Sequence, residues 1–215
     1  MKPKEFIKRL ILFIFGLFFT GLGIAFSIHA DLGISTISSL PNVLSIKYDF
    51  LTFGMWSSLT NCLMLLAQIL ILRKNFEPLQ LLQIPLSFVF GYFCDIGLWM
   101  VSGIPVPNYF IRLLLVFASV IILGFGIALT VISNTLYNSG EGLVKVISDT
   151  TKKDFGRVKI VFDICIVATS ALLSLLLLGE IVGIREGTLI AALLTGAVVN
   201  IFCRLLKEPL NKILT

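Results

Sequence analysis

Two carboxylates and two amides stand within long apolar segments of the sequence, where such side chains are costly. They are Asp95, Asp163, Asn61 and Asn200. A carboxylate beside an amide can coordinate a cation or accept a hydrogen bond from a solute. It can equally be a satisfied contact between helices. Asp163 also follows Lys159 at the i, i+4 spacing that places an ion pair on one helical face. Both interpretations, a ligand site and a structural contact, stay open.

A second group of polar residues flanks two short segments of mixed polarity. Asp31 and Ser35 lie at the start of the first, and Asn138, Ser139 and Glu141 lie at the start of the second. Short helices that begin inside a membrane direct their free N–H groups toward the cavity between the helices. Serine is also a common N-cap, and the spacing from Asn138 to Glu141 resembles a capping box. These residues therefore either cap the short helices or contact a ligand.

Motifs for catalysis and for cofactor binding are absent from the sequence. There is no HExxH, no GxSxG, no Walker A loop and no GxGxxG that opens a helix after a strand. The four cysteines lie inside apolar runs without a CxxC spacing, as small buried thiols would. We expect no enzyme, no cofactor and no metal site.

The composition predicts an all-α integral membrane protein. Of the 215 residues, 57% are hydrophobic and 13% are charged, whereas soluble domains have about 45–50% and about 25%. The apolar runs are continuous rather than alternating, so helices satisfy the backbone in lipid better than a barrel would. A lipid bilayer is the expected partner.

Six segments are long enough to span a membrane, since a span needs about 20 apolar residues. They cover residues 10–28, 53–72, 79–101, 110–132, 158–178 and 188–202. The two shorter segments, 33–46 and 139–148, cannot span and are predicted to be re-entrant or interfacial helices. The first apolar run is too long for a signal peptide and is read as a retained span.

Lysine and arginine residues are distributed as the positive-inside rule requires. With the N-terminus in the cytoplasm, only Lys47, Arg112 and Arg185 fall on the outer side. The net charge of +5 therefore reflects topology and not a nucleic-acid partner. We expect six spans and both termini in the cytoplasm.

The two halves of the chain repeat each other. Residues 21–27 (GLGIAFS) resemble residues 124–130 (GFGIALT), Gly54 matches Gly156, and Gly91 matches Gly196. The same comparison pairs Asn61 with Asp163 and Asp95 with Asn200. We predict one unit over 1–106 and a second over 107–215, each with three spans and one short helix. An odd number of spans inverts the second copy, as in many secondary transporters.

Several motifs together resemble the YczE/YyaS/YitT family of bacterial multi-pass membrane proteins. The matching pieces are residues 21–25 (GLGIA), 30–33 (ADLG), 140–143 (GEGL), 155–158 (FGRV), 187–190 (GTLI) and 194–196 (LTG). The chain departs from the family at Ser35-Thr36, where many relatives have Pro-Trp, and at Glu141, where an Asp is expected. The resemblance implies a bacterial cytoplasmic membrane protein, in a family whose members mostly lack an assigned activity.

The expected function is movement of a small solute or ion by alternating access around a site between the repeats. Two alternatives remain open. One is a non-transporting membrane partner or regulatory subunit, and the other is the substrate-binding membrane subunit of an ATPase-driven uptake system. A homo-oligomer or another membrane partner is compatible with each of them.

Overall fold

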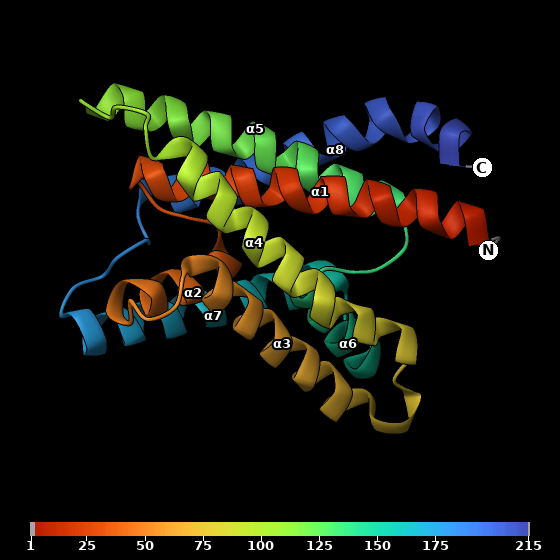
Figure 1. The fold of residues 1–215 in the computed structure, drawn as a ribbon. Coiled ribbons are helices and arrows are strands. Elements are labelled where there is room, and N and C mark those ends of the chain that lie inside the picture. The colour runs from red at the N-terminus through yellow and green to blue at the C-terminus, as the bar shows by residue number, and fades with distance from the viewer. Residues whose placement is uncertain (1–2, 215) are drawn as a thin grey trace.

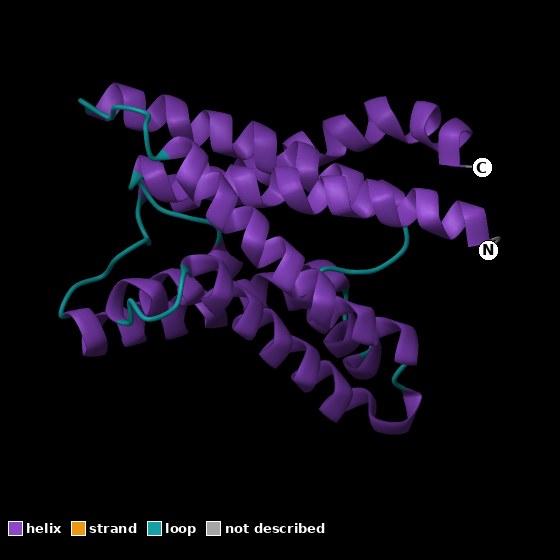
Figure 2. Cartoon of the chain, in the orientation of Figure 1, coloured by secondary structure: helices purple, strands orange, loops and turns teal. Residues whose placement is uncertain are grey.

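Helices account for all the regular structure in residues 3–214, the part of the chain that the computed structural model describes. The α-helices are α1 (Pro3–Ala30), α2 (Thr36–Lys47), α3 (Phe53–Leu72), α4 (Gln83–Val101), α5 (Tyr109–Ser133), α6 (Ser139–Thr151), α7 (Phe155–Leu178) and α8 (Glu186–Leu214). Two 3₁₀ turns, η1 (Arg73–Asn75) and η2 (Pro78–Leu82), join α3 to α4. Figure 2 shows helices joined by loops, with no strand in the described residues.

Six of these helices, α1, α3, α4, α5, α7 and α8, are long and apolar enough to cross a membrane. The predicted all-α class with six spans and two short helices is thereby confirmed. Helices α1 and α8 run beyond their apolar segments into charged turns, and an ion pair between Glu5 and Arg9 (3.0 Å) joins successive turns of the first extension.

Matching positions of the two halves begin helices in the same way. Thr52 caps α3 by accepting a hydrogen bond from the Met55 N–H, and Asp154 caps α7 by accepting one from the Arg157 N–H, both at 3.2 Å. These caps satisfy N–H groups that the first helical turn leaves without a partner. The prediction of two inverted copies, 1–106 and 107–215, gains local support here and stays a prediction.

The helices form two layers (Figure 1). Helices α1, α5 and α8 form one layer, and α2, α3, α6 and α7 form the other. The short helices α2 and α6 both pack against α3 and α7, within the helix bundle. Both termini lie at one end of the molecule, which we call the terminal end; the other is the opposite end.

Small residues bring the backbones of α1 and α5 together. A Cβ atom at Gly16 would lie 2.9 Å from the carbonyl oxygen of Gly126, and one at Gly23 would lie 2.6 Å from the backbone nitrogen of Leu123. Gly21 faces α4 in the same manner, since a Cβ atom there would lie 3.0 Å from the backbone nitrogen of Cys94. The glycines of α1 thus allow close packing against both α5 and α4.

The two layers are bridged by α4 but not by α8. Helix α4 packs on both α1 and α3, and a Cβ atom at Gly54 of α3 would clash with the carbonyl oxygen of Gly91 of α4. Helix α8 packs on α5, but within the described residues it hardly touches α7. A Cβ atom at Gly196 of α8 would meet nothing within 4 Å. The α3–α4 contact is thus closed, and its α7–α8 counterpart is open.

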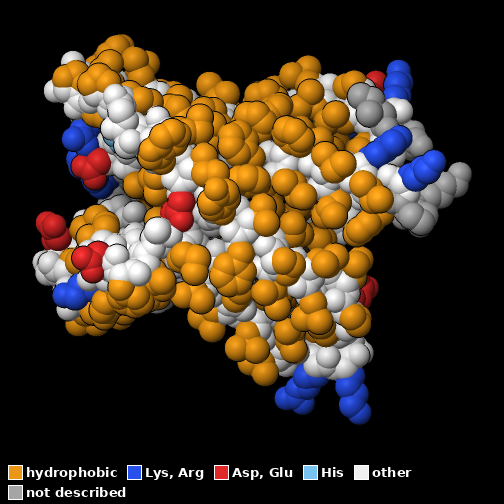
Figure 3. All heavy atoms as spheres, in the orientation of Figure 1, with side chains coloured by type: hydrophobic (Ala, Val, Ile, Leu, Met, Phe, Trp, Pro, Cys, Tyr) orange, Lys and Arg blue, Asp and Glu red, His pale blue; other side chains and the backbone are white. Residues whose placement is uncertain are grey.

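Hydrophobic side chains cover most of the face shown in Figure 3, and the lysine and arginine side chains in this view gather toward the two ends. This pattern suits a bilayer, because lipid solvates the apolar middle and water solvates the charged ends.

The glycine contacts lead to a matched stability test. Gly54→Ala and Gly91→Ala should each lower the stability of the folded state by about 1–3 kcal/mol, because the added methyl group overpacks the α3–α4 contact. Gly196→Ala is the control and should change stability little, since space is open there. Thermal unfolding of purified protein in detergent measures the difference. Equal shifts in all three variants would contradict the assignment of α3–α4 as the closed contact.

Candidate functional site

A cavity of about 890 Å³ lies between the two layers. This volume falls in the range of small-molecule sites, about 300–1,000 Å³. The wall combines apolar and polar side chains from both layers. Of the nine residues predicted as site candidates, six line the cavity: Ser35, Asn61, Asn138, Glu141, Asp163 and Asn200.

An ion pair within α7 forms one polar wall. Lys159 donates to both carboxylate oxygens of Asp163, with 2.7 Å to Oδ2, and the Thr36 hydroxyl donates to Oδ1 at 3.1 Å. The i, i+4 spacing predicted the pair correctly. The contact from Thr36 ties the start of α2 to α7, and sequence reasoning missed it. The one feature of the sequence that points to this contact is that Thr36 directly follows the candidate residue Ser35.

Glu141 of α6 faces the cavity and makes no hydrogen bond or ion pair with the described residues. Helix α6 is not one of the six spanning helices. Burial raises the pKa of the Glu141 carboxyl above its ordinary value; Lys159 lowers this pKa and Asp163 raises it.

The two amides lie in different environments. Asn61 of α3 is 3% exposed, whereas Asn200 of α8 is exposed, and neither side chain makes a hydrogen bond with the described residues. Asn61 therefore presents its amide to the cavity, where the amide can bond to a ligand or water.

The short helices contribute caps and wall residues. The Asn138 side chain accepts a hydrogen bond from the Ser139 N–H at 3.0 Å, so it caps α6. Ser35 precedes α2 without a side-chain cap bond and lines the cavity. Capping thus explains Asn138, and it does not explain Ser35.

Three predicted site residues lie outside the cavity wall. The Asp95 carboxylate accepts hydrogen bonds from the Thr52 hydroxyl (2.6 Å) and from the Gly54 N–H (2.8 Å), so it joins α4 to the start of α3. Asp31 pairs with Arg112 at 2.9 Å at the opposite end. In both cases the carboxylate is occupied by a protein partner.

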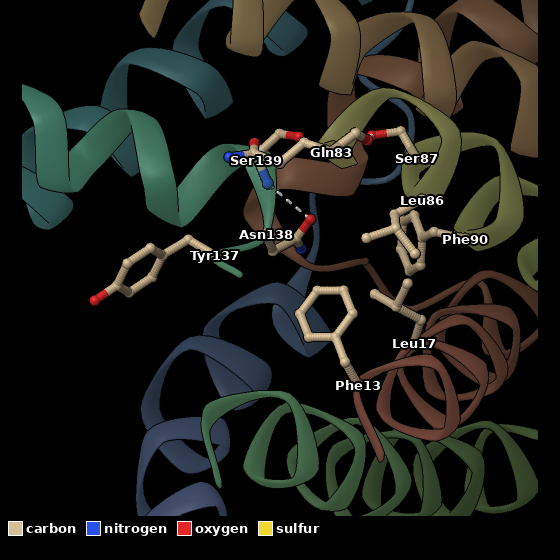
Figure 4. Close-up of a pocket in the computed structure, with 9 residues that line it drawn as sticks. All are labelled: Phe13, Leu17, Gln83, Leu86, Ser87, Phe90, Tyr137, Asn138 and Ser139. Atoms are coloured by element: carbon tan, nitrogen blue, oxygen red, sulfur yellow. Dashed lines mark hydrogen bonds between the residues drawn. The ribbon is translucent and has the colours of Figure 1, made fainter. Parts of the chain in front are cut away.

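The third, Ser139, lines a small neighbouring pocket between α1, α4 and the start of α6. In Figure 4, Phe13 and Leu17 face Leu86 and Phe90, and Tyr137 points away from the group. Ser139 is 2% exposed, and its carbonyl oxygen accepts a hydrogen bond from Gln68 at 2.9 Å.

At the opposite end, hydrogen bonds join the loop after α1 to the α7–α8 loop and the first turn of α8. The Ile34 N–H donates to the Gly183 carbonyl oxygen at 3.0 Å, and the Gly187 N–H donates to that of Leu32 at 2.7 Å. Arg185 adds a bond of 3.0 Å to the Asp31 carbonyl oxygen. No such bonds join the matching loops, 134–138 and 73–82, in the described chain at the terminal end.

Within residues 3–214, no group of three or more His, Cys, Asp or Glu side chains could hold a metal ion. The polar groups that face the cavity are carboxylates, amides, hydroxyls and one lysine.

Residues 7–204 match a family described as a family of unknown function, DUF6198. The chain is a member of the DUF6198 family. No curated protein and no solved structure matches it. Membership therefore adds no substrate to what the cavity itself indicates.

The raised pKa of Glu141 gives a pH prediction with a definite sign. A carboxyl whose pKa is higher in the folded state stabilises the fold at low pH, and this contribution is lost as pH rises through the raised value. The melting temperature of the wild type, minus that of Glu141→Gln, should therefore fall as pH rises above about 4.3, the ordinary glutamate value. Asp149→Asn, an exposed acid on the same helix, is the control. A difference that stays constant with pH would contradict the burial of Glu141.

Proposed function

We propose that this DUF6198 protein is a carrier that moves a small organic cation across the membrane by alternating access. The observation that carries the proposal is the mixed cavity between the layers, which has hydrogen-bonded connections at the opposite end and parted helices α7 and α8 beside it. An enclosed polar site between repeats is where secondary transporters bind their substrates.

Paired contacts support the inverted repeat on which alternating access depends. Arg9 donates to the Ser133 carbonyl oxygen at 3.2 Å, and its counterpart Arg112 donates to that of Ala30 at 3.1 Å. Each arginine joins the start of one long helix to the end of the other. The same interaction therefore occurs at both ends of the α1–α5 pair.

The orientation in the membrane follows from the charges. The excess of lysine and arginine supports placing the terminal end in the cytoplasm. The cavity would then be closed toward the outside, in an inward-facing conformation. The resemblance to the YczE/YyaS/YitT family adds the bacterial cytoplasmic membrane as the expected location.

The charge of the cavity wall supports a cationic substrate. Glu141, Lys159 and Asp163 are the charged side chains in the wall, and the last two neutralise each other. An ionised Glu141 would have no partner, and an unpaired charge away from water is unfavourable. A proton or a cation removes that cost. The volume and the apolar walls favour an organic cation over a bare ion.

Ligand-induced stabilisation tests the substrate class, because a ligand that binds only the folded state raises its melting temperature. Tetraethylammonium chloride should raise the melting temperature of the wild type and of the control Asp149→Asn, and not that of Glu141→Gln. Disodium glutarate, an organic anion, should have no effect. Stabilisation by glutarate, or an equal response of Glu141→Gln to tetraethylammonium, would contradict the cation assignment.

Transport itself is tested with purified protein in liposomes. We expect uptake of radiolabelled tetraethylammonium without any added ATPase, and a loss of about tenfold or more in Glu141→Gln. Binding without uptake would favour the subunit of an ATPase-driven system. Neither binding nor uptake would favour the non-transporting partner.

A further inference from the structure

Asp95 clamps the outer ends of α3 and α4 together in this conformation. Its Oδ1 accepts from the Gly54 N–H at 2.8 Å, and its Oδ2 accepts from the Thr52 hydroxyl at 2.6 Å. The Gly54 N–H lies in the first turn of α3, so it has no partner within its own helix. The bond to Asp95 satisfies this group and closes the helix pair at the opposite end.

The second half of the chain contains the matching parts. Asp154 and Gly156 correspond to Thr52 and Gly54, and Asn200 corresponds to Asp95. The correspondence holds in the packing as well as in the sequence. A Cβ atom at Gly21 would meet the backbone nitrogen of Cys94 at 3.0 Å, and one at the matching Gly124 would meet that of Val199 at 3.4 Å.

These parts are apart in this conformation. Asn200 is exposed and makes no side-chain hydrogen bond with the described residues. A Cβ atom at Gly156 would meet only Asp154 Oδ1, at 3.2 Å, and one at Gly196 would meet nothing within 4 Å. At these two positions no neighbouring helix occupies the space that the closed α3–α4 contact fills in the first copy.

The hydrogen-bond donor and the hydrogen-bond acceptor change places between the two copies. In the first copy the capping residue, Thr52, is a hydroxyl donor, and its partner, Asp95, is a carboxylate acceptor. In the second copy the capping residue, Asp154, is an acceptor, and the matching residue, Asn200, carries an amide that can donate. Each copy thus has one donor and one acceptor at the same two positions.

We infer that Asn200 closes α8 onto α7 in an outward-facing conformation, with its amide N–H donating to Asp154 and its amide oxygen accepting from the Gly156 N–H. The Thr52–Asp95 clamp opens as this inner clamp forms. The inference rests on the proposed function, because the two clamps alternate only in a protein that alternates access.

Disulfide trapping detects the inner clamp. The Ser58 hydroxyl contacts the Ser87 carbonyl oxygen at 2.9 Å across the closed α3–α4 pair, and the matching positions are Ile160 and Ala192. Ile160→Cys with Ala192→Cys should form a disulfide slowly, as the outward-facing conformation is visited. Ser58→Cys with Ser87→Cys is the matched control and should form one readily. Cys62, Cys165 and Cys203 are first replaced by alanine, and the fully buried Cys94 is kept.

Substitutions of Asn200 and Asp154 test whether the hydrogen bonds of the inner clamp, and not only the approach of α8 to α7, control disulfide formation. Asn200→Asp places two carboxylates together and should slow disulfide formation between positions 160 and 192 about tenfold. Adding Asp154→Thr recreates the Thr–Asp pair of the first copy, and it should restore the rate while keeping a capping residue on α7. The 58–87 disulfide should form in every variant, which shows that the fold is intact.

The outcomes are distinct. A 160–192 disulfide that forms equally fast with Asn200→Asp, or that Asp154→Thr fails to restore, overturns the clamp and leaves alternating access in place. No 160–192 disulfide in liposomes, with the 58–87 disulfide present, overturns alternating access and the clamp together.

Discussion

The close approach of α1 and α5 is the contact on which the other helices depend. Gly16, Gly23 and Gly126 leave no room for a side chain between the two backbones, so these helices cannot shift far without losing dense contact. Helix α4 packs on α1 through Gly21, and α8 packs on α5 through Gly124. The α1–α5 pair therefore acts as a fixed axis, and neither α3 nor α7 packs directly on it to any extent.

Ion pairs and hydrogen bonds within the protein determine which polar residues remain available to bind a ligand. Lys159 is bound to Asp163, and Arg112 to Asp31, so these four groups form internal pairs. Asp95 is held by Thr52 and the start of α3. Partner contacts of this kind lower the cost of polar groups in a membrane protein. Glu141 and Asn61 have no partner in the described residues, and they face the cavity.

The sequence predicted the helices better than it predicted the contacts of individual side chains. Apolar length alone located the six spans and the two short helices, because lipid leaves a helix few alternatives. The repeat identified Asn61, Asp163 and Asn200, all of which line the cavity. Apolar patterning could not show that Asp95 is turned toward Thr52, since the partner lies in a loop far away in the sequence. The same holds for Asp31, whose partner Arg112 is recognisable only once the α1–α5 packing is known.

Helices α7 and α8 are parted, whereas the matching pair, α3 and α4, is closed. Distances between spin labels on the protein in liposomes test directly whether this asymmetry reverses. Labels at positions 157 and 204 report the α7–α8 gap, and labels at positions 55 and 102 report the α3–α4 gap. Alternating access predicts two populations, in which one distance is long where the other is short. A single population, with the first distance always long and the second always short, would contradict it.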